Sequence, residues 1–248
     1  MKPPVDSIVA PPFPGRLTWI NSEPLRTDEL LGAPVLVEFW DFCRVNSIRT
    51  LPYMRAWHER YAPAGLQVIG VHASGFECSA DPEAVRAALA RLGIAYPVVL
   101  DTELEIWSLY GNLGWPARYL FNHEGTLFEY HYGEGAYAET ERAVQELLGI
   151  SREPVAAERP EDAPEVLLSP QSPDVAGPYS GPYEAGSVWA VLEGGGVVVA
   201  NGRRIEVTHP GAYELVRNER HTVGRLELEL PESVRCHAVC FTPGLPPR

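Results

Sequence analysis

Hydrophobic positions divide the chain into an N-terminal region of alternating strands and helices and a C-terminal region of strands. The apolar runs Val35–Trp40 and 66–72 have the continuous hydrophobicity typical of central parallel strands. Between them, Pro52 is expected to bend a helix, because proline removes one backbone donor. This order predicts a βαβ unit. The apolar residues that recur at roughly helical spacing between the runs are Val45, Ile48, Met54, Trp57 and Tyr61.

The rest of the N-terminal region continues this alternation. Asp81 and Pro82 have the residue types of a helix N-cap and first turn, and Gly93 is typical of the C-terminal end of that helix. A mixed sheet with helices on both faces is therefore predicted. The remaining predicted elements are strands at 98–100, 117–122 and 126–132 and helices at 103–110 and 138–148, the last closed by Gly149.

Beyond the last helix, the composition changes twice. Residues 151–184 are rich in Pro, Glu, Asp, Ser and Gly and show no sustained periodicity, which indicates a linker or an extended wrap. Residues 185–248 then alternate in six short predicted strands, with an Asn201-Gly202 hairpin turn. We therefore expect an α/β domain over 1–150, a linker over 151–184, and an all-β sandwich or jelly-roll-like domain over 185–248.

Length and charge narrow the function classes. The 248 residues exceed one usual domain, and 45% hydrophobic content supplies two cores. A net charge of -13 argues against a nucleic-acid or anionic-membrane surface, because both need positive charge. The first six residues lack the apolar segment of a secretory signal, and no apolar run is long enough to span a bilayer. As written, the sequence predicts a soluble cytoplasmic protein.

The segment Phe39–Tyr53 holds the candidate chemistry. It leaves a predicted buried strand and opens a predicted helix, and the unpaired amides and dipole of a helix start can stabilise a thiolate. This segment resembles the active-site region of the TlpA/DipZ-like branch of the thioredoxin superfamily, whose two cysteines fall on Arg44 and Ser47 here. The other stretches that carry the resemblance, over some 140 residues, are 19–25, 70–72, 114–117 and 133–141.

The resemblance implies a thioredoxin fold, and the C-terminal region is similar in placement and length to the β-sandwich of DipZ-like proteins. It also implies that Trp115-Pro116 is a cis peptide facing the active-site loop and shaping a groove for an extended protein or peptide partner. Glu38 falls where the family keeps a buried acid that accepts the second cysteine's proton. The binding residues expected around this groove are Trp40, Arg44, Ser47, Trp115 and Pro116.

Two readings of the chemistry follow. Arg44 cannot form a disulfide and Ser47 cannot resolve one, so the first reading is a partner- or peptide-binding module with little dithiol activity. The second is a redox enzyme, a thiol-disulfide reductase or a peroxidase, that uses Cys43 alone or with Cys78 as a relocated pair. Cys43 and Cys78 follow neighbouring parallel strands, which end at the same edge of a sheet. The alternative for Cys43 is a small residue without chemistry, whose side chain points away from the groove.

The remaining candidates are weaker. Cys236 and Cys240 lie roughly 13 Å apart along one face of a predicted strand, with His237 on the other face, so no metal site is expected there. Tyr179, Tyr183 and Trp189 can stack on a sugar, which makes glycan binding by the C-terminal domain a third reading, although β-sandwich cores also hold aromatics. No metal and no cofactor are predicted.

Overall fold

The computed structural model of the chain describes residues 1–2 and 7–248. Residues 3–6 lie outside the described residues. They belong to the N-terminal segment in which the sequence predicts no secretory signal. Two compact units are present. The first consists of residues 1–41, 46–75 and 80–156, and the second of residues 42–45, 76–79 and 157–248.

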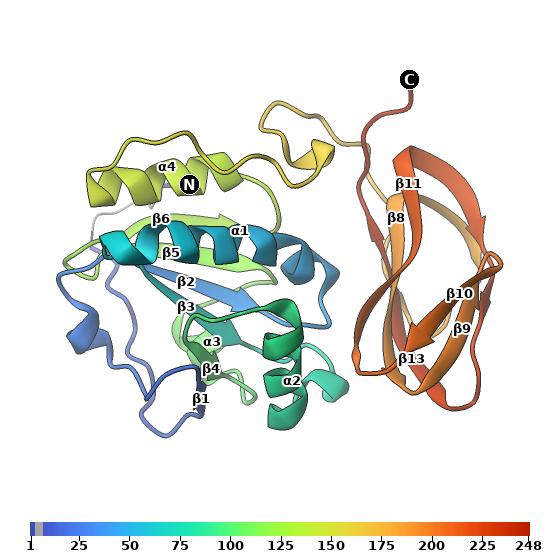
Figure 1. Cartoon of the computed structure of the whole chain (residues 1–248), viewed down its shortest axis with the longest axis horizontal. Coiled ribbons are helices and arrows are strands. Elements are labelled where there is room, and N and C mark those ends of the chain that lie inside the picture. The colour runs from blue at the N-terminus through green and yellow to red at the C-terminus, as the bar shows by residue number, and fades with distance from the viewer. Residues whose placement is uncertain (3–6) are drawn as a thin grey trace. The chain divides into compact units, whose positions relative to one another are not determined.

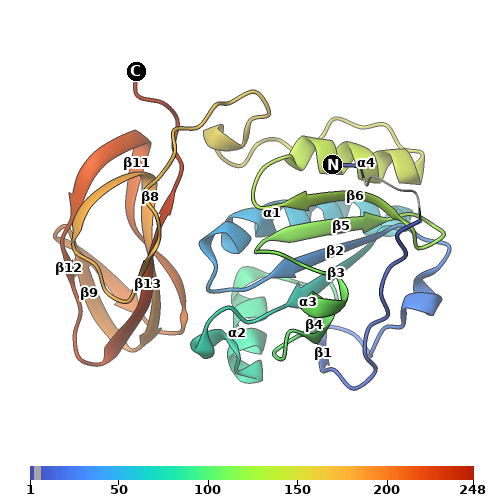
Figure 2. The ribbon, with the colours of Figure 1, turned by 180° about the vertical axis from the view of Figure 1, so that it is seen from behind.

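A six-stranded mixed sheet forms the centre of the first unit, in the order β1-β4-β3-β2-β5-β6. Strands β2, β3 and β4 are parallel, and β5 runs antiparallel to β2. Figures 1 and 2 show α1 on one face of the sheet and α3 on the other. The elements are β1 (Trp19–Ile20), β2 (Val35–Trp40), α1 (Val45–Tyr61), β3 (Gln67–His72), α2 (Pro82–Leu92), β4 (Val98–Leu100), α3 (Glu105–Leu109), β5 (Ala117–Phe121), β6 (Leu127–Tyr132) and α4 (Tyr137–Leu148).

The predicted mixed sheet with helices on both faces is confirmed, and so are the residues that limit its helices. Asp81 caps α2 by accepting hydrogen bonds from the backbone amides of Glu83 and Ala84. Gly93 and Gly149 end α2 and α4 in the left-handed conformation, which glycine adopts without steric cost. Each of these ends follows from local residue chemistry.

Alternation along β2 separates the two faces of the sheet. Val35, Val37 and Phe39 point into an apolar cluster that also contains Ile106 of α3. Glu38 therefore points to the opposite face, as does Arg118, its partner in the antiparallel β5 register. Arg118 lies over the rings of Trp57 in α1 and Tyr137 in α4, so these two helices cover that face.

Two antiparallel sheets form most of the second unit, in the orders β10-β9-β12 and β11-β8-β13-β7. One core contains buried side chains of both sheets, among them Val198 of β9 and Val239 of β13. Asn201 and Gly202, with φ of 49° and 79°, make the predicted two-residue hairpin turn. The strands are β7 (Val175–Ala176), β8 (Gly181–Gly194), β9 (Gly196–Ala200), β10 (Arg203–Val207), β11 (Gly211–Leu226), β12 (Leu228–Glu229) and β13 (Val234–Thr242).

The prediction of six short strands is wrong in this unit. β8 has 14 residues and begins at Gly181, and β11 has 16 residues. Register shifts in β11 lie between Glu214 and Val216 and between Arg217 and Thr222. Such irregularities keep a strand continuous while they break its alternation, which is why the sequence pattern predicts only residues 212–216 of β11 as a strand.

Candidate functional site: a cysteine pair after two parallel strands

Cys43 and Cys78 lie in turns that follow the central strands β2 and β3. The two strands are parallel and end in register, with Trp40 opposite His72. Cys43 lies in the turn just before α1, and Cys78 lies in a short 3-10 turn, Glu77–Ser79. Because both strands end at the same edge of the sheet, residues distant in sequence come close together there.

Hydrogen bonds of Asp41 and Ser79 shape the chain near these turns. An Asp41 carboxylate oxygen accepts a hydrogen bond of 2.7 Å from the backbone amide of Gly75, which joins the ends of the two strand segments. The Ser79 hydroxyl donates to the backbone oxygen of Phe76 at 3.0 Å and so closes the 3-10 turn that holds Cys78. Side chains that bond to local backbone stabilise such turns.

The Sγ atoms of Cys43 and Cys78 lie 3.7 Å apart, and no disulfide joins them. Cys43 is fully buried, whereas 7% of Cys78 is exposed. A disulfide bond is about 2.05 Å long, so closing it requires the two sulfurs to approach by about 1.7 Å. The structure thus confirms that the topology brings these two thiols together; whether they pair stays a prediction.

Arg44 and Ser47 occupy the positions where the resemblance places the family's cysteines. Ser47 is fully buried in the first turn of α1, and its hydroxyl accepts a hydrogen bond from the Asp41 amide at 3.3 Å. The Arg44 guanidinium lies 4.6 Å from the centre of the Phe76 ring. Neither side chain carries sulfur, so any dithiol reaction at this edge of the sheet depends on Cys43 and Cys78.

Glu38 is a fully buried acid on β2. Burial raises the pKa of Glu38 to about 8, and the positive charge of Arg118 opposes part of that rise. At neutral pH the carboxyl group is therefore mostly protonated. A proton held in this way can be passed on only to a group within reach. Among the residues that the structure describes, none, Ser47 included, is hydrogen-bonded to the Glu38 carboxyl oxygens.

The expected groove residues differ in exposure. Trp40 is fully buried and packs edge-on to His72 at 5.0 Å, so its ring lies beneath the surface. Trp115 is half-buried; its indole nitrogen donates to the backbone oxygen of Ala73 at 2.8 Å, and its ring lies 4.3 Å from Trp107. The Trp115-Pro116 peptide is cis.

A family model described as the AhpC/TSA family matches residues 10–129. That range contains β1 to β5, the turns of both cysteines and the Trp115-Pro116 peptide. The N-terminal part of this chain is a thioredoxin-superfamily domain.

Relatives of this thioredoxin-superfamily domain include DipZ of Mycobacterium bovis, which is 34% identical over 172 residues, or 66% of this chain and 25% of DipZ. The chain thus spans about a quarter of that relative's length. The thiol-disulfide oxidoreductase YkuV of Bacillus subtilis is 26% identical over 139 residues, or 56% of this chain and 93% of YkuV.

Solved structures show the same fold for this domain. A thioredoxin-like protein in its oxidised form matches with a TM-score of 0.53 and 24% identity, covering 57% of this chain and 95% of that one. A thiol-disulfide isomerase of Corynebacterium glutamicum matches with a TM-score of 0.51 and 23% identity, covering 57% and 98%.

The cysteines and aromatic residues of the C-terminal strands lie in environments that differ from that of Cys43 and Cys78. Burial raises the pKa of Cys236 to about 11 and that of Cys240 to about 12, so both stay protonated at neutral pH. Tyr183 is buried and stacks on Phe241 at 6.0 Å, which takes its ring out of any sugar-binding surface. Trp189 is half-buried, and its indole nitrogen donates to the Ser187 hydroxyl.

Sequence reasoning missed two residues near Cys78. Glu193 and His237 form a hydrogen bond of 2.9 Å, and each has a donor atom within 4.8 Å of the Cys78 sulfur. The strand pattern alone places His237 on an ordinary β-strand, and no periodic signal relates it to Cys78. The Cys-X3-Cys spacing of Cys236 and Cys240, which contains His237, suggests a different pair of cysteines as its metal-binding neighbours.

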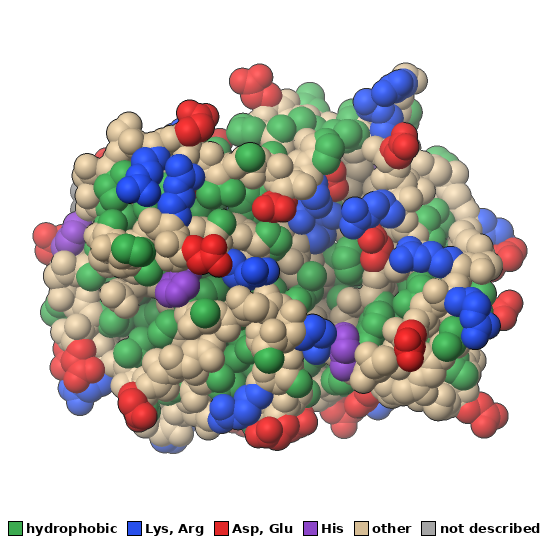
Figure 3. All heavy atoms as spheres, viewed as in Figure 1, with side chains coloured by type: hydrophobic (Ala, Val, Ile, Leu, Met, Phe, Trp, Pro, Cys, Tyr) green, Lys and Arg blue, Asp and Glu red, His purple; other side chains and the backbone are tan. Residues whose placement is uncertain are grey.

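Surface charge agrees with the composition. Figure 3 shows acidic and basic side chains interspersed over the face it draws, without a continuous basic patch among the described residues there. Of the helices in residues 1–2 and 7–248, none combines the length and the apolar character that crossing a bilayer requires.

Proposed function

We propose that this protein exchanges electron pairs with thiol-disulfide partners through Cys43 and Cys78, a relocated pair in a thioredoxin fold. The observation that supports this function is the 3.7 Å separation of the two sulfurs at the end of β2 and β3. The positions of the usual pair hold Arg44 and Ser47, which cannot carry the reaction.

The exchange takes two displacement steps. The thiolate of Cys78, the more exposed of the two cysteines, attacks one sulfur of a partner disulfide, and the other partner sulfur leaves as a thiolate. The Cys43 thiolate then attacks the Cys78 sulfur and releases the partner's second thiolate. Two electrons and two protons pass from the protein to the partner, and the protein retains a Cys43–Cys78 disulfide.

Turnover of a model disulfide tests this proposal. Reduction of insulin by dithiothreitol should be faster with the full chain, and Cys43→Ala or Cys78→Ala should lower the rate by about tenfold or more, since each removes an atom that reacts. Cys236→Ala and Cys240→Ala are matched controls, because their thiols are also buried and stay protonated. Acceleration that survives loss of both Cys43 and Cys78 would refute the proposal.

Burial of the pair supports a second candidate, a binding module with little dithiol activity. Cys43 has no exposed surface, and thiol-disulfide exchange requires access to the attacking sulfur. In this case Trp115, held by Ala73 and Trp107, contributes to a surface for an extended peptide. The module should leave insulin reduction unchanged yet bind the reduced insulin B chain, and Trp115→Ala should weaken that binding while Trp189→Ala does not.

A further inference from the structure

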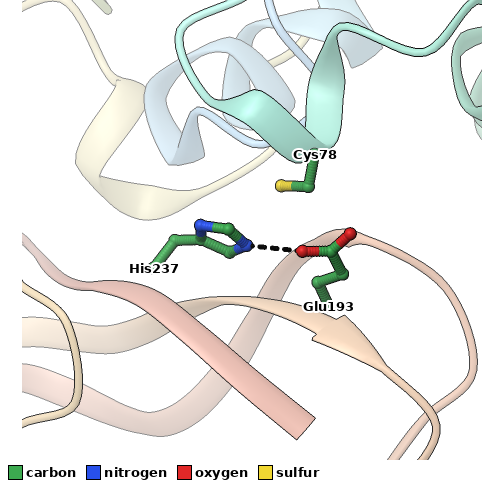
Figure 4. A group of neighbouring side chains, drawn as sticks. All are labelled: Cys78, Glu193 and His237. Atoms are coloured by element: carbon green, nitrogen blue, oxygen red, sulfur yellow. Dashed lines mark hydrogen bonds and ion pairs between the residues drawn. The ribbon is translucent and has the colours of Figure 1, made fainter.

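Three metal-ligating side chains meet in the second unit of the structure. Figure 4 shows the Cys78 side chain next to the hydrogen-bonded side chains of Glu193 and His237. One donor atom of each residue lies within 4.8 Å of the other two. These residues come from three places in the sequence, so no short motif brings them together.

Local backbone structure positions the two residues from the strands. Glu193 lies near the end of β8, where it pairs with Arg235 of β13. A register shift between Cys236 and Ala238 makes His237 an extra residue in β13, and a bulge of this kind redirects a side chain. The result is the hydrogen bond of 2.9 Å between His237 Nε2 and a Glu193 carboxylate oxygen.

We propose that Cys78, Glu193 and His237 bind one zinc ion, with a water molecule as the fourth ligand. Sulfur, nitrogen and oxygen donors of these residue types are those that zinc takes in tetrahedral sites. A thiolate and a carboxylate also balance the two positive charges of the ion. Three protein ligands with an open fourth position are typical of zinc sites that exchange a ligand.

The donor separations are compatible with such a site. Zinc binds sulfur at about 2.3 Å and nitrogen or oxygen at about 2.0–2.2 Å, so ligand atoms around a tetrahedral ion lie about 3.2–3.7 Å apart. The described atoms, within 4.8 Å of one another, need shifts of about 1 Å to reach these spacings. The Glu193 side chain, which is 42% exposed, leaves a path for the ion from solvent.

Phe76 and Glu77 lie near the proposed site, and each interacts with an arginine. The Phe76 ring lies 6.2 Å from the His237 ring, and the Arg44 guanidinium lies over that same Phe76 ring. Arg235 forms an ion pair of 3.6 Å with Glu77, so its charge is partly balanced. The His237 side chain is 8% exposed and is thus held in place more firmly than a surface histidine.

Sharing of Cys78 connects zinc binding to the redox state, and this consequence rests on the proposed function. When a partner disulfide oxidises Cys43 and Cys78, two electrons leave the pair, the sulfur–sulfur bond forms and the Cys78 thiolate is consumed. Zinc then loses one of three ligands. Zinc binding and the Cys43–Cys78 disulfide should therefore exclude one another.

The test is a zinc titration of the full chain in competition with a chromophoric chelator. Before the titration the protein is freed of metal and reduced with a phosphine. We expect one zinc per chain. Cys78→Ala and His237→Gln should each weaken zinc binding by ~10- to 100-fold or more. Loss of a residue that only hydrogen-bonds a metal ligand already weakens binding by that factor. Replacing zinc by cobalt should give sulfur-to-metal charge-transfer absorption that Cys78→Ala abolishes. His123→Gln and Cys240→Ala are the controls, and circular dichroism checks that each variant folds.

The outcomes separate this proposal from the proposed function. His237→Gln should lose zinc yet still form the Cys43–Cys78 disulfide, whereas Cys43→Ala should keep zinc and lose the disulfide. Absence of stoichiometric zinc binding, or binding that survives both Cys78→Ala and His237→Gln, would overturn the zinc site. A third result would also overturn it: the protein binds no zinc, and Cys78 is alkylated more slowly in His237→Gln than in the unchanged chain. Cys78 and His237 would then be a nucleophile and its base rather than zinc ligands.

Discussion

Glu38 and Arg118 lie directly opposite each other on β2 and β5, and both are fully buried. The Arg118 guanidinium lies 5.0 Å from the centre of the Tyr137 ring, and one of its nitrogens donates to the backbone oxygen of Gly135. The Glu38 carboxyl oxygens have no hydrogen-bond partner among the described residues. An acid without a hydrogen bond, deep in the sheet, is expected to be stable mainly in its neutral form.

Replacing Glu38 should change how stability depends on pH. The pKa of Glu38 rises from 4.5 to about 8 on folding, so between these pH values the folded chain holds a proton that the unfolded chain releases. Stability from this group is therefore lost as pH rises through that window, by about 2–5 kcal/mol at its upper end. Glu38→Gln should remove this loss.

Urea unfolding at both ends of the window measures the effect. The difference in unfolding free energy between Glu38→Gln and the unchanged chain should grow from pH 5 to pH 8. Other titrating groups, such as buried His72, are present in both proteins and cancel in the difference. Glu124→Gln, at an exposed position, is the control. Equal pH slopes for Glu38→Gln and the unchanged chain would contradict the account.

Glu141 of α4 connects three parts of the first unit. Its carboxylate accepts hydrogen bonds from the Trp57 indole at 3.1 Å, the Tyr61 hydroxyl at 2.6 Å and the Val155 amide at 2.7 Å. Glu141→Ala leaves these buried donors unsatisfied and should lower the unfolding free energy by about 3 kcal/mol in denaturant titrations. Glu146→Ala, at an exposed position of the same helix, should change it by less than about 0.5 kcal/mol; similar losses in both variants would contradict this role.

Asp81 satisfies two amides at the start of α2. Asp81→Ala should lower the unfolding free energy by about 1 kcal/mol, because the Glu83 and Ala84 amides lose their acceptor. Asp81→Asn and Asp81→Ser keep an acceptor oxygen and should retain most of the stability in the same unfolding experiment. A loss as large in Asp81→Ser as in Asp81→Ala would contradict the claim that the acceptor oxygen of the cap provides this stability.

Most strands and helices of the first unit could be predicted from the sequence, because its hydrophobic pattern and its helix-capping residues indicate the same elements. The continuous hydrophobicity of Val35–Trp40 predicts a central strand, and the structure buries all six of its residues. Predicted and observed ends differ by a few residues at α3, where Glu105–Leu109 is shorter than the helical pattern at 103–110. Helix ends are less strongly specified by local sequence than helix centres.

The second unit could not be predicted as well, because its strands bend. The polar stretch between Arg217 and Thr222 has no alternation, yet β11 continues through it with a shifted register. Gly181 and Pro182, which resemble linker residues, open β8. Pairing with a neighbouring strand maintains such segments, and pairing between distant strands leaves no period in the sequence.

Only the part of the candidate site that follows from the order and direction of the strands could be predicted from the sequence. The approach of Cys43 to Cys78 follows from two parallel strands that end at the same edge of a sheet. Glu193 and His237 come close to Cys78 through tertiary packing and a bulge in β13, for which the sequence carries no signal. Residues of this kind are identified by three-dimensional proximity rather than by spacing.

The central claim is that Cys43 and Cys78 form the reacting pair, and mass spectrometry after mild oxidation tests it most directly. The oxidised full chain should lose two hydrogens, resist alkylation at Cys43 and Cys78, and yield one disulfide-linked peptide containing both, while Cys236 and Cys240 remain thiols. If Cys43 and Cys78 both stay alkylatable after denaturation of the oxidised protein, no disulfide forms between them and the claim is contradicted.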